Sequence, residues 1–240
     1  MEFARLGAVF AELHTPRPGA ELVGTQLCLA CVDVLDVTEV GILLVDAAGG
    51  STSFGTSDAS PVGVVEDLQF TLGEGPGLDA HASGRPVLEP DLSRHSAAHW
   101  SAFASAAIRE GVFGVFSFPL RAGTSRLGAL DLSSAVAGEL SARQRRDATV
   151  MAAVVTQTLL AAQTGARPGR LGVDLDDSPT LRLEVHQAAG MVSEQLDIRT
   201  ADALVLLRAH AYAAERGIDA VARDVVMRKL RIGGRLDGGG

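Results

Sequence analysis

The sequence predicts an α+β fold, in which an antiparallel sheet flanked by helices is followed by a separate all-α bundle of three helices. Two pairs of strand-like segments are each joined by a short turn, which is the pattern of β-hairpins. A long apolar helix closes this part of the chain, and three short amphipathic patterns follow a stretch rich in Gly, Pro and Asp. The 240 residues suffice for two domains that each bury a core.

Breaks in the periodicity divide the chain into five parts. The first helical pattern stops at Pro16, Pro18 and Gly19, and the longest break follows residue 163. The predicted parts are an N-terminal helical extension at 1–19, an α+β domain at 20–163, a linker at 164–180, a helical module at 181–236 and a Gly-rich tail at 237–240.

In the α+β domain, apolar residues three and four apart predict helices, and alternating or continuous apolar runs predict strands. Ser60 and Pro61 suit the N-cap and N1 positions of one helix, and Ser141 with Gln144 forms a capping box for the last one. Helices are expected at 20–36, from 60 onward, and at 78–83, 97–110 and 142–163, with strands at 39–45, 51–54, 86–89, 111–121 and 127–134.

The segment 142–163 is apolar on more than one side. Its inward positions recur three and four residues apart, close to a heptad seam. They are Ala148, Met151, Val155, Thr158 and Ala162. A helix of this kind has to pack against its own domain and against another surface. We therefore expect a homodimer formed through this helix, which contacts either its own copy or the helix at 20–36 of a second chain.

The helical module contains three successive patterns. The first helix has apolar residues at helical spacing from Leu181 to Leu196. Thr200 is the expected N-cap of the second helix, and Gly217 is its expected left-handed C-terminal cap. The third helix is expected to start near Asp219. These patterns alone are also those of a small bundle that only packs.

The two predicted domains differ in charge. Residues 1–180 carry 12 basic and 21 acidic side chains, whereas residues 181–240 carry 9 and 8. Between positions 223 and 236, Asp224 is the only acidic residue among Arg223, Arg228, Lys229, Arg231 and Arg235. A cluster of this kind is typical of a phosphate-binding surface, and cations at the end of a helix also complement its dipole.

Several classes of protein are disfavoured by the sequence. It has no uncharged apolar run of membrane-spanning length and no signal-peptide pattern, so we expect a cytoplasmic protein without a membrane partner. Cys28 and Cys31 are the only cysteines, which excludes a disulfide scaffold, and no further ligands cluster with them for a metal. No catalytic set or cofactor motif emerges. We therefore expect a protein that is not an enzyme.

The stretch 73–92 is rich in glycine and lies near the candidate ligand pocket. Gly73, Gly75 and Gly77 invite a phosphate-binding interpretation, but the Lys-Ser/Thr ending of a P-loop and a dinucleotide fingerprint are both missing. A tight loop at the edge of a sensory pocket is preferred. The candidate pocket residues are Phe116, Phe118 and Asp131. Asp131 is an acidic residue in an apolar strand. Its side chain could form a hydrogen bond with a ligand, form one with a neighbouring backbone group, or lie on a solvated face.

Residues 20–163 resemble a GAF domain. The resemblance rests on the opening helix, the first strand pair, the GEGP, GRPV and PDL motifs of segment 73–92, the LGAL motif of segment 127–134 and the closing helix. It implies a sensory domain with a small molecule as its ligand.

Residues 181–232 resemble the ANTAR domain, a three-helix RNA-binding module of bacterial transcription antitermination regulators. A GAF sensor is a common N-terminal companion of this module. The matching positions are Gln187, Ala188, Gly190 and Met191, then Ala203, Leu207 and Arg208, then Val221, Ala222 and Val225. The resemblance implies that a dimer binds paired stem-loops in nascent transcripts and competes with a terminator.

The same resemblance implies an RNA-binding surface. We expect close approach at His186, Gln187, Ala189 and Gly190, and cations from Arg208, Arg216, Arg223, Arg228 and Lys229. We expect this surface to bind the unpaired loop bases of RNA, with Arg or Lys contacting the RNA backbone, in preference to duplex DNA. Family members commonly carry Lys before the glycine, where this chain has Ala189.

Three alternatives stay open. The module could be a helix-turn-helix that binds DNA, although its third helix offers mainly Arg and Lys as base readers. The protein could be a ligand-sensing dimer that does not bind RNA. The third alternative is a methionine sulfoxide reductase of the GAF type, in which Cys28 and Cys31 would cycle through a disulfide.

Overall fold

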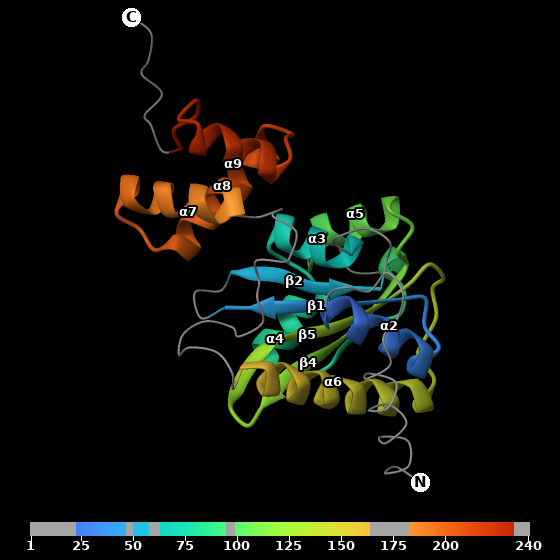
Figure 1. Ribbon diagram of the computed structural model, residues 1–240. Coiled ribbons are helices and arrows are strands. Elements are labelled where there is room, and N and C mark those ends of the chain that lie inside the picture. The colour runs from blue at the N-terminus through green and yellow to red at the C-terminus, as the bar shows by residue number, and fades with distance from the viewer. Residues whose placement is uncertain (1–22, 47–49, 58–62, 95–98, 164–182, 233–240) are drawn as a thin grey trace, which may run out of the picture. The chain divides into compact units, whose positions relative to one another are not determined.

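The computed structural model describes residues 23–46, 50–57, 63–94, 99–163 and 183–232. The chain divides into two compact units, of which the first comprises Met1–Val45 with Ser51–Ser178 and the second includes Pro179–Gly240 (Figure 1). The predicted helical extension, linker and Gly-rich tail lie outside the described residues. Each unit is described by itself below.

The first unit is built on a five-stranded sheet with strand order β2-β1-β5-β4-β3, in which every neighbouring pair is antiparallel. The strands are β1 Glu39–Val45, β2 Ser51–Thr56, β3 Val87–Glu89, β4 Gly114–Ala122 and β5 Ser125–Ser134. The two predicted hairpins are confirmed. In the first, the Asp46 carboxylate accepts a bond from Gly50 N at 2.8 Å and closes the turn.

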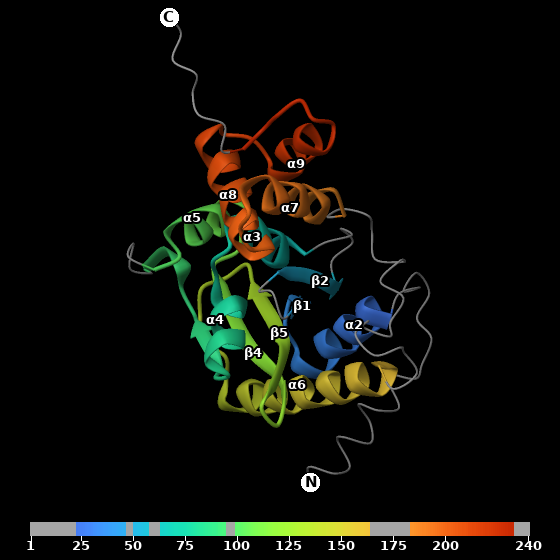
Figure 2. The same ribbon diagram turned by 90° about the vertical axis from the view of Figure 1, so that its left-hand side faces the viewer.

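Helices cover both faces of this sheet (Figure 1). On one face lie α2 Val23–Leu35 and α6 Ala142–Gln163, and on the other lie α3 Val64–Leu72, α4 Pro76–Ser83 and α5 Ser101–Arg109, with a short 3-10 turn η1 at Leu92–Arg94. Figure 2 shows α4 lying across β4 and β5. The larger apolar core fills the α2 and α6 side, and a second cluster joins α3 to α5.

The bounds of α6 agree with the prediction, and its capping box is formed. Ser141 N donates to Gln144 Oε1 at 3.0 Å, and Gln144 N donates to Ser141 Oγ at 3.2 Å. The amide of Gln144 also donates to the carbonyls of Leu35 and Asp36, at 3.3 and 3.1 Å. The start of α6 therefore caps the end of α2.

The starts of α3 and α5 differ from the prediction. The described part of α3 begins at Val64 with Gly63 as N-cap, and the predicted N-cap Ser60 lies outside the described residues. Helix α5 begins at Ser101 after Trp100, whose φ of 48° is left-handed. Its first turn is capped from a distance, because Glu74 Oε1 accepts bonds from Ala102 N and Phe103 N, both at 2.9 Å.

The predicted heptad seam of α6 packs inside its own unit. Ala148, Met151 and Val155 are fully buried in the core cluster that they share with Leu27 of α2. The helix at 20–36 was predicted as the partner of α6 in a second copy, and within this chain it already covers the seam. These three side chains are thus unavailable to a second copy, and their periodicity reflects the core.

At one point α2 meets β2 backbone to backbone. A Cβ added to Gly24 would lie 2.0 Å from Phe54 O, and one added to Gly55 would lie 2.3 Å from the carbonyl carbon of Gly24. Real Cβ atoms do not approach other atoms so closely. Both positions therefore require glycine.

The second unit consists of three mutually packed helices, α7 Leu183–Leu196, α8 Thr200–Ala213 and α9 Ile218–Val226. Two predicted caps are wrong. Arg199 is the N-cap of α8, and Thr200 is the first helical residue. Gly217 has φ of −62° and is the N-cap of α9, while Glu215, with φ of 51°, makes the left-handed turn after α8.

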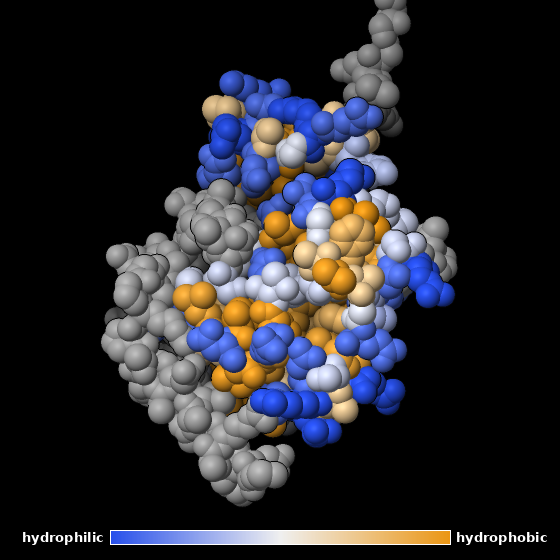
Figure 3. All heavy atoms as spheres, turned by 90° about the vertical axis from the view of Figure 1, so that its right-hand side faces the viewer, coloured by the Kyte–Doolittle hydropathy of each residue, from blue (hydrophilic) through white to orange (hydrophobic). Residues whose placement is uncertain are grey.

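Apolar and charged residues alternate on the surface of the first unit. Figure 3 shows apolar residues in a belt on the first unit, interrupted by charged side chains. None of the helices in the described part of the chain is long and apolar enough to cross a bilayer.

Candidate functional site

A buried polar centre lies between α4 and the sheet. Asp131 of β5 is 1% exposed, and its Oδ2 accepts a bond from Gln69 Nε2 at 2.7 Å. The other end of the Gln69 amide accepts a bond from Gly77 N at 2.6 Å, in the first turn of α4. A Cβ on Gly77 would lie 2.6 Å from Asp131 Oδ2, so glycine is required there. The centre thus connects β5, α3 and α4 through polar atoms.

Burial raises the pKa of Asp131 from 3.8 to about 6, while Ser117 and Gln69 oppose the rise. Ser117 pairs with Asp131 across the strands, close enough to favour the ionised carboxylate, although its geometry is not that of a hydrogen bond. Among the described residues, Asp131 Oδ1 and Ser117 Oγ have no hydrogen-bond partner. The centre therefore keeps unused polar capacity in a dry environment.

Helix α4 is held to the unit mainly by polar contacts. Its buried residues, Pro76, Gly77 and Ala80, are small. Asp79 Oδ2 accepts bonds from Trp100 Nε1 at 3.0 Å and lies 2.7 Å from His99 Nε2. At the other end, Arg121 donates to Gly84 O at 3.2 Å, and Arg126 donates to Ala82 O. These contacts hold α4 against β4 and β5.

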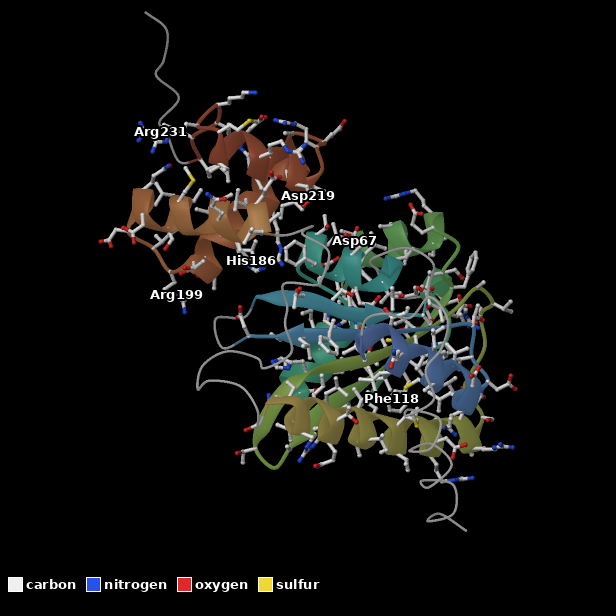
Figure 4. All side chains as sticks on the ribbon, viewed as in Figure 1. Asp67, Phe118, His186, Arg199, Asp219 and Arg231 are labelled. Atoms are coloured by element: carbon white, nitrogen blue, oxygen red, sulfur yellow. The ribbon has the colours of Figure 1, made fainter. Side chains whose placement is uncertain are left out.

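The three predicted pocket residues do not share a site. Phe116 and Phe118 belong to the core cluster on the α2 and α6 side, and Figure 4 shows Phe118 between the sheet and α6. Asp131 lies on the opposite face, because side chains alternate along a strand. A cavity of about 430 Å³ is lined by Phe116, Leu132 and Gln144, among others, and Asp131 is not part of it. Grouping the phenylalanines with Asp131 was wrong.

Both cysteines lie in the core of the first unit. Cys28 and Cys31 are 0% exposed and form no disulfide. Burial raises the pKa of Cys31 to about 12, and burial together with Cys31 raises the pKa of Cys28. Neither presents a thiolate to solvent at neutral pH. No group of three or more His, Cys, Asp or Glu side chains in the described part of the chain is arranged to hold a metal.

In the second unit, part of the predicted RNA-binding surface is formed. His186 and Gln187 are exposed on α7, and Gly190 follows them on the same face at helical spacing. A Cβ added to Gly190 would meet no atom within 4 Å. Nothing among the described residues of this unit requires a glycine there, although a glycine inside a helix costs about 0.5–1 kcal/mol relative to alanine. The backbone of α7 is therefore bare beside two polar side chains.

Ala189 does not belong to this surface. It is 1% exposed and packs with Val185, Ala188 and Val192 on the inner side of α7. The expected close approach of a ligand at Ala189 is wrong, because the residue before Gly190 faces the bundle.

The predicted cations fall into two groups. Arg216 lies 2.6 Å from Asp224, and Arg223 lies 3.3 Å from Glu184, both at the surface. Arg228 and Lys229 are exposed beyond α9 and form no ion pair with a described carboxylate. Figure 4 shows Arg231, which follows them closely, on the other side of the unit from His186. Arg208 of α8 is half-buried. Arg216, Arg223 and Lys229 lie near one another, because all three lower the pKa of Asp224.

Sequence reasoning missed Gln69 and Glu74. Gln69 bridges Asp131 to α4 across 62 positions, and Glu74 caps a helix that begins 27 positions later. No local pattern marks either role. The one usable signal was the glycine at position 77, whose bare backbone leaves room for a buried side chain.

The first unit is similar to several solved structures. A GAF domain of an Acinetobacter phosphoenolpyruvate-protein phosphotransferase matches with TM-score 0.54 and 15% identity, over 70% of this chain and 98% of that one. The GAF domain of the Coxiella burnetii phosphoenolpyruvate-protein phosphotransferase matches with TM-score 0.51 and 15% identity, over 68% and 95%.

A free methionine-R-sulfoxide reductase from Neisseria meningitidis, solved with its substrate, matches with TM-score 0.50 and 14% identity, over 67% of this chain and 89% of that one. No protein-family model matches the sequence, and no curated protein matches it. The order of the strands, the helices on both faces and these likenesses together show that the first unit has the GAF fold.

Proposed function

We propose that this protein is an RNA-binding regulator of transcription antitermination, in which the GAF-like unit senses a small molecule and controls an ANTAR-type module in residues 181–236. The observation that carries the proposal is the bare backbone at Gly190, beside exposed His186 and Gln187. Glycine at position 190 makes α7 less stable than alanine would, and packing within the unit does not explain the choice. Close approach of a nucleic-acid backbone to α7 would explain it.

The charge of the second unit supports RNA as the partner. Arg228 and Lys229 extend beyond α9, and the ion pairs of Arg216 and Arg223 lie at the surface, where such pairs contribute little and can be exchanged for phosphate contacts. Arg216, Arg223 and Lys229 all lie near enough to Asp224 to lower its pKa, so these cations gather in one part of the unit, which suits contacts with nucleic-acid phosphates.

A helix-turn-helix that reads DNA is a weaker proposal. The recognition helix of such a motif contacts base edges with its first residues. Here that helix would be α9, which has nine residues, with Asp219 in its first turn and Arg223 paired to Glu184. An acidic first turn opposes entry into a groove lined by phosphates.

We place the sensory site of the first unit at the buried polar centre of Asp131, Ser117 and Gln69. The support for this placement is that Asp131 Oδ1 and Ser117 Oγ are buried polar atoms without a hydrogen-bond partner among the described residues, so a bound polar molecule could supply one. A redox role for Cys28 and Cys31 is disfavoured, because both thiols are buried and have raised pKa values. Two modules in a homodimer would bind paired stem-loops jointly, which raises avidity.

The test is a binding measurement on the full chain. RNAs with two hairpins and randomised loops are selected on the protein, and the selected RNA is compared with duplex DNA of the same sequence over a salt series. We expect the RNA to bind with an affinity that falls as salt rises, and the DNA to bind much more weakly. Equal affinity for the DNA, or failure to select any RNA at low salt, contradicts the proposal.

A further inference from the structure

The outer face of α8 carries apolar side chains that are exposed. Val205, Leu206 and Tyr212 are 58%, 37% and 74% exposed. Ala209 and Ala213 are exposed as well. Val205, Ala209 and Tyr212 follow at intervals of four and three, and Leu206 and Ala213 lie three before and four after Ala209, so all five share one face of the helix. We call this face the α8 stripe.

The two ends of the stripe are complementary in charge. Arg199 and Asp202 lie 2.8 Å apart at the start of α8, and Glu215 and Arg216 follow its end. Arg216 is itself paired with Asp224 at 2.6 Å. Two α8 helices in antiparallel orientation bring the start of one to the end of the other, so each end meets both an acid and a base. This complementarity does not require any of these charges to be unpaired within its own chain.

An anionic partner fits the stripe less well. None of the five stripe residues is a cation, and a carboxylate lies near each end, at Asp202 and Glu215. Arg208 is half-buried beside the stripe and already has an interaction partner in the chain, so it offers no uncompensated charge. Phosphates would therefore meet apolar surface and carboxylates. A second copy of the same helix presents an apolar surface with matching ends.

A two-fold contact has a natural centre at Ala209, which lies seven positions from both Asp202 and Arg216. With the axis there, Ala209 faces its own symmetry mate, and Tyr212 lies opposite Val205 of the second copy. A small side chain at the crossing point allows two helix axes to approach to about 8 Å. The larger side chains on either side of it then pack between the two helices.

We infer that the α8 stripe is a dimer interface of this protein, in which two copies pair α8 in antiparallel orientation about a two-fold axis at Ala209. The inference goes beyond the proposed function, because it places the contact of the homodimer on α8, apart from the α7 residues proposed to bind RNA. One helix from each chain is less than the about 800 Å² per partner of a standard interface, so we expect a dissociation constant on the order of micromolar.

The test is sedimentation equilibrium of the full chain without RNA, from about 1 to about 200 μM. Ala209→Asp and Ala209→Lys are each expected to weaken dimerisation by more than about 30-fold, because like charges meet at the two-fold axis. An equal mixture of the two variants should dimerise within about tenfold of the parent, because Asp then faces Lys. The matched controls are Ala153→Asp and Ala153→Lys, at an exposed alanine of α6, which leave dimerisation unchanged. Circular dichroism checks that every variant keeps its helices.

A parent chain that stays monomeric over this range overturns the inference. Dimerisation of Ala209→Asp with the affinity of the parent does so too, and so does a mixture that fails to recover, because the stripe would then contact something other than its own copy. Loss of dimerisation in the Ala153 variants instead would place the interface on α6. The RNA selection is a separate measurement. A dimer that selects no RNA contradicts the proposed function alone, and a monomer that binds RNA contradicts this inference alone.

Discussion

The carboxyl group of Asp131 couples the stability of the first unit to pH. Its pKa is raised from 3.8 to about 6 by burial, so between these values the folded chain binds more protons than the unfolded chain. The stability contributed by the neutral carboxyl is complete below about pH 4 and is lost as the pH rises through about 6. The loss amounts to about 3 kcal/mol for a shift of about two pH units.

Asp131→Asn is expected to remove this dependence. The Asn carbonyl still accepts the bond from Gln69, but the side chain cannot ionise. Urea unfolding of both proteins, followed by Trp100 fluorescence between about pH 4 and pH 8, should show the variant gaining up to about 3 kcal/mol over the parent as the pH rises. A constant difference across this range would show that Asp131 does not titrate near 6.

Gly190→Ala separates stability from binding. The added methyl group meets no atom of the unit, so the substitution should stabilise α7 by about 0.5–1 kcal/mol. The same methyl group fills the bare patch beside His186 and should weaken RNA binding. Thermal unfolding by circular dichroism and an RNA titration measure the two effects. Gln195→Ala, at another exposed position of α7, is the control, and equal RNA affinity in Gly190→Ala would remove the main support for the proposed function.

At the scale of elements, the junction between α6 and α2 depends on one amide. Gln144 completes the capping box and donates to the last carbonyls of α2. Gln144→Ala is expected to lower the free energy of unfolding by about 1–2 kcal/mol, because helix ends on both sides lose partners. Gln157→Ala, on the exposed side of the same helix, should change it by less than about 0.5 kcal/mol. Equal effects in urea unfolding would contradict this assignment.

Local chemistry explains which elements the sequence could predict. The capping box gave the start of α6, and Gly84, with φ of 68°, ends α4 as expected from its sequence. The caps around α8 were misjudged, because Glu215 adopts the left-handed turn and Gly217 does not. Asn and Gly favour that conformation, so the sequence pointed to Gly217, and no local pattern marks Glu215 as the residue that adopts it.

The candidate sites were predictable only in part. The resemblance to the ANTAR domain assigned His186, Gln187 and Gly190 to one surface of the first helix, where they are accessible, yet it also assigned Ala189, which the helix turns toward the bundle. Asp131 was recognisable as an acidic residue in an apolar strand. Its partner Gln69 was not, since the bond between them depends on how α3 packs on the sheet.

For the whole molecule, the two cysteines and the single tryptophan report on the same unit. Cys28, Cys31 and Trp100 are all buried in the first unit. A thiol reagent is expected to leave the native protein unmodified and to react with both cysteines in step with the loss of native Trp100 fluorescence in urea. Reaction in native buffer at the rate of a free thiol would contradict the burial of α2.

The contact of Gly24 with Gly55 sets a fixed distance within the first unit. Where helix and strand meet through backbone atoms alone, their separation follows from covalent dimensions and van der Waals radii. The bulk of neighbouring side chains has no part in it. Substitutions of the apolar residues around this contact are therefore expected to leave the distance between α2 and β2 unchanged, as long as the total side-chain volume is kept.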